Sequence, residues 1–282
     1  MSEVFRNKRP LAAVERYGPW PPPPFRADRV KLTSPEELRS WIVHEDENLL
    51  VVNKSGEVVC HPSKFGPTSS LVGAAREYCG LVTVHLIFRL DRETSGVVVM
   101  AKNAETASRL QTAVQKRRVA KTYLAFLVGQ LAEAVTVDQP LGADEQSPVW
   151  VKDTVRADGK PAVSHFTPIA DSGKFTVARV TIETGRKHQI RAHAQWLGHS
   201  VVGDKIYGPD DRHYLSFIET GWTDELAQAL LMRRQALHCT EIDLRPAGVP
   251  MVFRAPLPPD MVEFARHAIP TAPLALTELL PE

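Results

Sequence analysis

The stretch Phe88-Arg89-Leu90-Asp91-Arg92-Glu93-Thr94-Ser95-Gly96 sets one carboxylate between two arginines and closes on small polar residues and a glycine. The apolar run Val97-Val98-Val99-Met100-Ala101 follows directly and predicts a buried strand. Asp91 therefore lies on a turn at the mouth of a strand. Because neighbouring positive charge favours an ionised carboxyl group, we expect Asp91 to be negative near neutral pH. A weak surface ion pair is the alternative interpretation of such a turn taken alone.

Three further blocks follow along the chain: Lys121-Thr122-Tyr123-Leu124-Ala125, Thr184-Gly185-Arg186-Lys187-His188-Gln189-Ile190-Arg191-Ala192-His193, and Gly203-Asp204-Lys205-Ile206-Tyr207-Gly208. Together with the aspartate turn, these ordered blocks resemble the RluA family of pseudouridine synthases, from about Val43 to about Pro256. The resemblance implies an enzyme that isomerises specific uridines in structured RNA, ribosomal or transfer RNA, to pseudouridine. Its usual histidine before Arg-Leu-Asp is replaced here by Phe88, which cannot form a hydrogen bond.

Strands and helices alternate along the chain in a way that indicates an α+β protein and not a doubly wound one. The predicted strands are 49–53, 97–101, 121–128, 175–183 and 236–244, and the predicted helices are 69–78, 104–117, 187–197 and 260–267. Asn103 is suited to cap the helix that begins at Ala104. The resemblance sharpens this to the pseudouridine synthase fold, a mixed, largely antiparallel sheet with flanking helices and a central RNA-binding cleft.

Two segments are predicted from composition. Residues 1–40 form a basic, proline-rich arm, and residues 41–282 form the catalytic domain. The four prolines after Trp20 favour an extended conformation, and residues 1–31 carry seven Lys or Arg against three acidic residues. The arm is too short for the S4-type RNA-binding domain of many relatives in the family. It either holds RNA by phosphate contact and stacking or packs on its own domain.

Composition also limits where and how the protein works. The 43% hydrophobic content fits a folded domain, and no apolar run approaches the about 20 residues that span a bilayer. The N-terminus has no apolar signal core, and three widely spaced cysteines suit reduced thiols, so we expect a cytoplasmic protein. We expect a monomer whose partner is RNA. A net charge of +1 leaves RNA binding to local basic patches.

Pseudouridine formation needs one ionised carboxylate beside the sugar, as nucleophile or base, and Asp91 is the candidate. It requires no cofactor and no metal, and the histidine spacings do not match a zinc motif. The resemblance implies that Arg191 pairs with Asp91 and that Tyr123 lies against the target base. The alternatives are a structural Arg–Asp bridge for Arg191 and a core position for Tyr123.

A further set of residues is expected to bind RNA. The set is Arg89, Arg92, Lys121, Arg186, Lys187, His188 and Ile190. The resemblance implies that Arg89 enters the gap left when the target uridine flips from its stack, and that Ile190 packs below the base. Phosphate or structural hydrogen bonds are expected for the histidines.

Two other classes of function compete with this interpretation. A non-catalytic RNA-binding protein or RNA chaperone would keep the same fold, and Phe88 gives it some weight. A glycosidase usually needs paired acidic groups, and only Glu93 accompanies Asp91 at a suggestive position.

Overall fold

The computed structural model describes residues 31–61 and 67–271. The predicted arm, with Trp20 and its prolines, lies outside the described residues as far as residue 30. The helices are α2 (Pro35–Ser40), α3 (Leu71–Cys79), α4 (Ala104–Gln115), α5 (Gln189–Trp196), α6 (Arg212–Thr220), α7 (Asp224–Leu230) and α8 (Pro259–Ala268). The strands are β1 (Ile42–Glu45), β2 (Leu49–Lys54), β3 (His85–Leu86), β4 (Ser95–Ala101), β5 (Ala120–Val128), β6 (Val135–Asp138), β7 (Leu141–Ala143), β8 (Asp153–Val155), β9 (Val163–Asp171), β10 (Phe175–Ile182), β11 (Leu237–Asp243) and β12 (Val252–Arg254).

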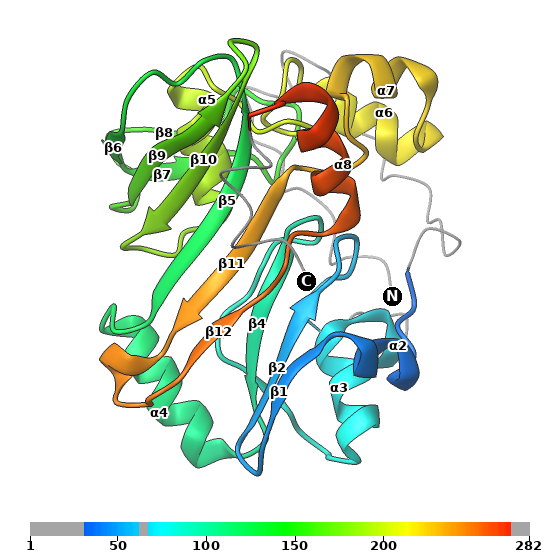
Figure 1. The fold of residues 1–282 in the computed structure, drawn as a ribbon, viewed down its shortest axis with the longest axis vertical. Coiled ribbons are helices and arrows are strands. Elements are labelled where there is room, and N and C mark those ends of the chain that lie inside the picture. The colour runs from blue at the N-terminus through cyan, green and yellow to red at the C-terminus, as the bar shows by residue number, and fades with distance from the viewer. Residues whose placement is uncertain (1–30, 62–66, 272–282) are drawn as a thin grey trace.

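One large sheet runs through the molecule in the order β1-β2-β4-β11-β5-β10-β9-β6, with β12 on β11 and β3 on β4 (Figure 1). Strand β11 is parallel to β4 and antiparallel to β5, and the other pairs are antiparallel. The prediction of a mixed, largely antiparallel sheet is confirmed. The late strand β11 therefore joins an early half of the sheet, β1, β2 and β4, to a later half, β5, β10, β9 and β6.

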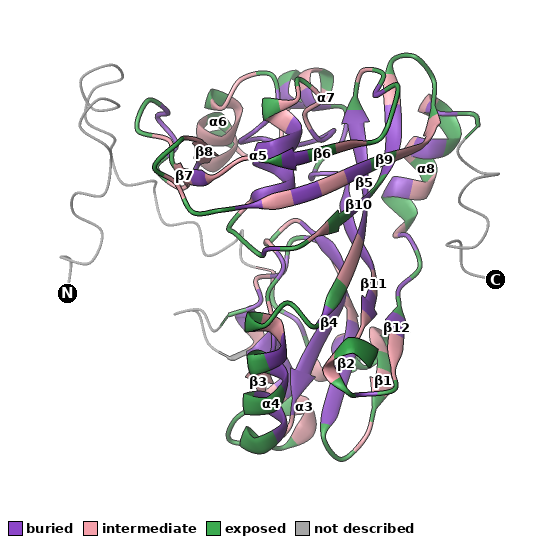
Figure 2. Ribbon diagram, turned by 90° about the vertical axis from the view of Figure 1, so that its left-hand side faces the viewer, coloured by how far each residue is buried: buried purple, intermediate pink, exposed green. Residues whose placement is uncertain are grey.

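Strand β4 forms where the valine run predicts it, and every one of its residues is buried (Figure 2). Burial on both faces explains why its sequence is continuously apolar and does not alternate. Gly96 begins the strand with φ +115°, and an added Cβ would lie 2.2 Å from the Cys239 carbonyl oxygen. Only glycine allows β4 and β11 to approach this closely.

Helices cover both faces of this sheet. Helices α3, α4 and α5 lie on one face and α8 lies on the other (Figures 1 and 2). The Asn103 side chain accepts a hydrogen bond from the Thr106 N–H, which confirms the predicted cap of α4. Helix α8 packs through Phe264, whose ring lies 6.0 Å from that of Phe126 and 5.3 Å from that of Phe175.

Three parts of the described chain add to or differ from the predicted elements. Helix α2 falls within the predicted arm, yet its Leu38 is fully buried in the core. Helices α6 and α7 were not predicted, and neither were strands β1, β3, β6 to β9 and β12. The three cysteines carry free thiols. No helix of the described residues is long and apolar enough to cross a bilayer.

Candidate active site

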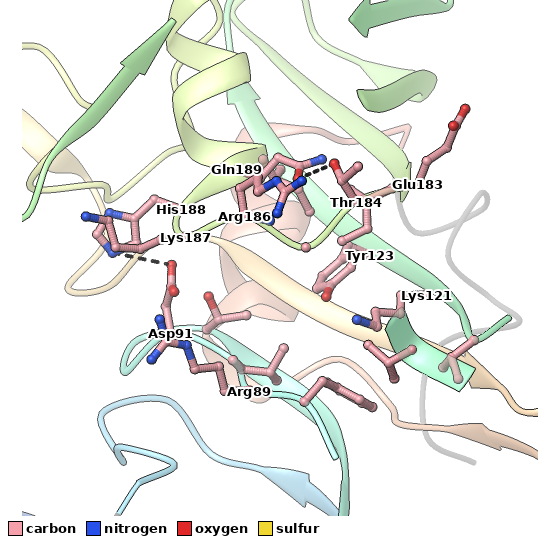
Figure 3. Close-up of a pocket in the computed structure, with 18 of the residues that line it drawn as sticks. Arg89, Asp91, Lys121, Tyr123, Glu183, Thr184, Arg186, Lys187, His188 and Gln189 are labelled. Carbon is pink, nitrogen blue, oxygen red and sulfur yellow. Dashed lines mark hydrogen bonds and ion pairs between the residues drawn. The ribbon is translucent and has the colours of Figure 1, made fainter. Parts of the chain in front are cut away.

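A pocket of about 520 Å³ opens where the Asp91 turn meets the start of β5 and the segment before α5 (Figure 3). The end of α4 and the end of β10 complete its wall. Nine of the ten predicted site residues line it: Arg89, Asp91, Lys121, Tyr123, Arg186, Lys187, His188, Ile190 and Arg191. The pocket thus gathers segments that are far apart in the sequence, such as those of Asp91 and Arg191, which are 100 residues apart.

Asp91 is held by a guanidinium from the opposite side of the pocket. Arg191 Nη1 donates a hydrogen bond of 2.9 Å to Asp91 Oδ2, and the Asp91 side chain remains 27% exposed. The same guanidinium donates from Nε and Nη2 to both carboxylate oxygens of Asp204, at 2.6 and 2.8 Å. Asp204 fixes Arg191, and Arg191 in turn fixes Asp91. We call these three residues the Arg191 cluster.

Burial and charge oppose each other in the Arg191 cluster. Burial works against ionisation of Asp91, but the positive charge and the hydrogen bond of Arg191 outweigh it and lower the pKa of this carboxyl group. For Asp204 burial is likewise outweighed by the charge and hydrogen bonds of Arg191, and its pKa is also lowered. The bidentate pair is a strong, directional contact. Asp91 therefore stands ionised at the base of an open pocket.

Tyr123 and Lys121 come from the first strand of the later half of the sheet. Tyr123 is 6% exposed, and burial raises its pKa well above the ordinary value, so its hydroxyl stays protonated. Burial also lowers the pKa of Lys121. The Lys121 ammonium lies 4.7 Å from the centre of the Phe88 ring. Phe88 thus forms a cation–π contact with Lys121 at the pocket.

The segment before α5 differs from the predicted helix 187–197, which was wrong at its start. The Gln189 side-chain oxygen accepts hydrogen bonds from the Thr184 hydroxyl at 2.7 Å and the Arg186 N–H at 3.0 Å. These bonds hold residues 184–188 as a loop, so the helix begins at Gln189. Lys187 pairs with Asp153 at 2.8 Å, and the Arg186 Nε donates to the Pro161 carbonyl.

His188 lies at the point where this loop enters α5. Its backbone has φ 55°, the left-handed conformation that favours glycine. Its Nδ1 lies 3.1 Å from the Tyr207 hydroxyl and its Nε2 lies 4.0 Å from Asp91 Oδ2, as Figure 3 shows by a dashed line. Burial first, and then the charge of Arg191, lowers the pKa of His188 to about 4. The imidazole is therefore neutral at physiological pH.

Several residues that support the site were missed by sequence reasoning. The fully buried Lys54 ammonium donates to the carbonyls of Ser55, Val58 and Arg92, which ties the Asp91 turn to the end of β2. The buried Gln235 amide donates to the Thr94 hydroxyl on the other side of that turn. Asp204 belongs to the block 203–208 that carries the family resemblance, but it was not among the predicted site residues. The Gly203-Asp204 pair marked the turn of that block in the sequence, whereas no sequence motif indicated the contact of Gln235.

The predicted RNA-binding cations do not share one environment. Arg89 is exposed at the pocket, two residues before Asp91. Arg92 lies outside the pocket lining, and its Nε donates to the Glu57 carbonyl at 3.2 Å. Arg117, which follows α4, also lines the pocket and pairs with Glu183 at 3.6 Å. The arginines of the pocket lining thus include one that was not predicted.

Comparison with known proteins identifies relatives of the whole domain. Residues 48–196 match the family model described as RNA pseudouridylate synthase. The chain is 34% identical over 229 residues to the ribosomal large subunit pseudouridine synthase D of Vibrio vulnificus, covering 79% of this chain and 68% of that protein. It is 33% identical over 236 residues to the enzyme of the same name from Escherichia coli strain K12, covering 81% of this chain and 70% of that protein.

Solved structures show the same fold. Human RNA pseudouridylate synthase domain containing 4 superimposes with a TM-score of 0.65 at 24% identity, covering 82% of this chain and 94% of that one. Human RNA pseudouridylate synthase domain containing 1 gives a TM-score of 0.62 at 24% identity, covering 83% and 86%. The overall fold is therefore shared with these proteins.

Proposed function

The chain belongs to the RluA family of pseudouridine synthases, and from this membership we propose that it converts a uridine of large-subunit ribosomal RNA to pseudouridine with Asp91 as the reacting carboxylate. RNA pseudouridine synthase activity is the function of the family. The two relatives described above are named for the large ribosomal subunit, which supports ribosomal over transfer RNA. The observation that carries the role of Asp91 is its ionised, partly exposed side chain at the base of the pocket.

The reaction is an isomerisation in which the bond between uracil N1 and ribose C1′ breaks and the bond between C5 and C1′ forms. The electron pair of the broken bond moves to the uracil ring, the C5 proton is lost and N1 gains a proton. A carboxylate near the sugar promotes cleavage, either by attacking C1′ or by removing a proton from C2′. Arg191 binds only Oδ2 of Asp91, which supports Oδ1 as the oxygen that reacts.

Tyr123 is suited to hold the uracil while it turns. Its ring lines the pocket and its protonated hydroxyl bears no charge. An aromatic face stacks on a base with about 1–3 kcal/mol per base. Ile190, which is 5% exposed at the same pocket, provides an apolar contact for the base. We assign Tyr123 to base stacking and Arg191 to the orientation of Asp91.

RNA enters this pocket only if the target nucleotide leaves its stack, at a cost of a few kcal/mol. Arg89 is exposed at the pocket two residues before Asp91, and we assign it to the vacated gap. Lys121, Arg186, Lys187 and His188 line the same pocket and supply contacts to the backbone or the base. The RNA contact of Arg92, which lies outside the pocket, stays a prediction.

The test is pseudouridine mapping. RNA from cells that lack the protein is incubated with the purified full chain, and pseudouridine is mapped in all RNA. New pseudouridine in large-subunit ribosomal RNA is expected. Pseudouridine only in transfer RNA would overturn the proposed substrate, and none in the whole pool would overturn the enzyme itself.

The domain division also remains a proposal. Residues 1–40 are proposed as an arm beside a monomeric catalytic domain, although Leu38 of α2 is already part of the core. A chain that starts at residue 32 is expected to bind RNA more weakly and with a smaller dependence on salt, because seven cations are removed. An unchanged salt dependence would exclude the arm from RNA binding.

A further inference from the structure

His188 faces the reacting carboxylate from a backbone conformation that histidine rarely adopts. Among the described residues only Glu57, Arg117, His188 and Leu231 are non-glycine residues with positive φ. A left-handed non-glycine residue costs about 1–3 kcal/mol and persists where its surroundings fix it. The His188 carbonyl accepts the Ala192 N–H, and the ring contacts Tyr207 edge-on at 5.6 Å. The folded protein thus tolerates an unfavourable backbone conformation at His188, which keeps this imidazole at the pocket.

The hydrogen bonds of Tyr207 determine which ring nitrogen of His188 carries the proton. The Tyr207 hydroxyl accepts the Asp153 N–H at 2.9 Å and lies 3.1 Å from His188 Nδ1. Tyr207 is fully buried, so its own hydroxyl proton needs an acceptor. Nδ1 is that acceptor, and in a neutral imidazole the proton then resides on Nε2.

The Nε2–H group is directed into the pocket without a hydrogen-bond partner in the described part of the chain. Its distance of 4.0 Å to Asp91 Oδ2 is too long for a hydrogen bond, and Oδ2 already accepts from Arg191 at 2.9 Å. A donor with 12% of its side chain exposed is thereby left for whatever enters the pocket. Figure 3 shows the ring of His188 above Asp91.

We propose that His188 is a further catalytic residue, which donates its Nε2–H to the O2 oxygen of the target uracil and stabilises the negative charge that builds there. This inference rests on the proposed function. O2 is bonded to the carbon next to N1, so it lies close to the bond that Asp91 helps to break. As the N1–C1′ bond breaks, its electron pair spreads over the ring to the oxygens. His188 donates a hydrogen bond and transfers no proton.

A matched pair of variants separates the two nitrogens of the ring. In His188→Asn the amide takes the place of Nδ1, tolerates the left-handed backbone and leaves no donor at Nε2. In His188→Gln the amide nitrogen takes the place of Nε2. Loss of one such donor typically slows catalysis by about 100- to 1,000-fold, and we expect this in His188→Asn with binding of unmodified target RNA changed less than about threefold. We expect His188→Gln to recover most of the rate.

The rate is measured in a single turnover at saturating enzyme, on RNA that wild type converts. If wild type converts no RNA, the proposed function is wrong, and this outcome is distinct from a failure of the role proposed for His188. Full activity of His188→Asn would overturn the role of His188. Equal loss in His188→Asn and His188→Gln, or loss of RNA binding that accounts for the rate, would assign it a structural role instead.

A second substrate tests the charge directly. Fluorine at C5 of uracil withdraws electrons and stabilises negative charge on the ring. The ring of 5-fluorouridine therefore depends less on a hydrogen bond from the protein. The His188→Asn substitution slows the rate at which the substrate is consumed. We expect this slowing to be smaller for RNA with 5-fluorouridine at the target position than for RNA with uridine. The same slowing for both would overturn the proposal. A wild-type rate that falls as pH rises through 6 to 7, and no longer does so in His188→Gln, would show a proton donor and overturn it as well.

Discussion

Two regions of the molecule each place one guanidinium between two carboxylates, and they differ in almost everything else. In the Arg191 cluster the Arg191 side chain is 5% exposed and that of Asp204 is 0% exposed. On the β7–β8 hairpin, Arg156 pairs with Glu145 at 2.9 Å and Asp158 at 2.5 Å, with side chains 30%, 58% and 69% exposed. The first network is enclosed, and the second lies in water.

Distance along the chain separates the two networks further. Arg156 reaches partners 11 and 2 residues away, whereas Arg191 reaches partners 13 and 100 residues away. A surface network of neighbours in sequence contributes little, because water and salt screen it. A buried network that joins distant segments fixes how those segments meet, and removal of one partner leaves a buried charge without compensation. The comparison teaches that similar bond lengths do not imply similar importance.

The largest expected effect comes from breaking the reacting end of the Arg191 cluster. Asp91→Asn should lower single-turnover activity by at least about a thousandfold, because a neutral amide cannot act as nucleophile or base. Folding should be retained with only a small change in the free energy of unfolding, because the Asp91 side chain is 27% exposed and Asp204 still pairs with Arg191. The check is tritium release from RNA labelled at uracil C5, beside a urea unfolding curve. Substantial residual turnover would contradict the role of Asp91.

The second test removes the negative charge of Asp204, the carboxylate that holds Arg191 in place. Asp204→Asn should reduce the free energy of unfolding by about 3–5 kcal/mol, because the Arg191 charge stays buried with half its partners. Activity should also fall, since Arg191 no longer holds Asp91 in place. Urea denaturation measures the first effect and single-turnover kinetics the second. A variant as stable as wild type would show that the cluster is not the buried anchor described here.

Buried histidines make the stability of the protein depend on pH. Burial lowers the pKa of both His188 and His238 from the ordinary 6.5 to about 4, so both are neutral in the folded protein. The unfolded chain takes up these protons as pH falls from 6.5 to 4, and the folded protein does not. Stability is therefore full above 6.5 and should fall across this window, by about 1.4 kcal/mol per pH unit for each histidine.

Urea midpoints at pH 7, 6 and 5 measure this slope. His238→Asn should flatten it, because the ring between the Ser95 hydroxyl and the Ala255 carbonyl is removed. The matched control is His267→Asn, on the exposed side of α8. An identical slope in all three proteins would contradict the burial effect.

The smallest effect is expected on the hairpin. Asp158→Asn removes one partner of Arg156 at a position exposed to water, and Glu145 remains in contact with that guanidinium. We expect the urea midpoint and the catalytic rate to match wild type. A shift comparable to that of Asp204→Asn would erase the distinction between the two networks.

The elements that sequence predicted well are those with strong local signals. The valine run before Ala101 and the Asn103 cap specify β4 and α4 within a few residues. The start of α5 was missed because the Gln189 side chain, and not the helix period, decides where residues 184–188 turn. Strands β6 to β9 are short or irregular, and Pro168 interrupts the regular register where β9 meets β10.

The site shows the same division. Asp91, Tyr123 and Arg191 stood out through the resemblance of their blocks to a family. The double clamp of Asp204 on Arg191 and the contact of Tyr207 with His188 depend on how a turn after α5 folds back, and no local pattern reports that. Arg89 and Arg92 flank Asp91 in the sequence, but only Arg89 lines the pocket. The Arg92 side chain donates a hydrogen bond to the Glu57 carbonyl instead.

The place of β11 in the sheet has a consequence for synthesis on the ribosome. Strands β4 and β5 are made early but never pair with each other, because β11 lies between them. In a nascent chain that has not reached Leu237, Asp91 before β4 and Tyr123 on β5 belong to two separate sheets with open edges. Catalytic competence should therefore arise abruptly, when the emerging polypeptide inserts its last long strand. Premature termination just before that point would yield an inert, aggregation-prone product and not a slow enzyme.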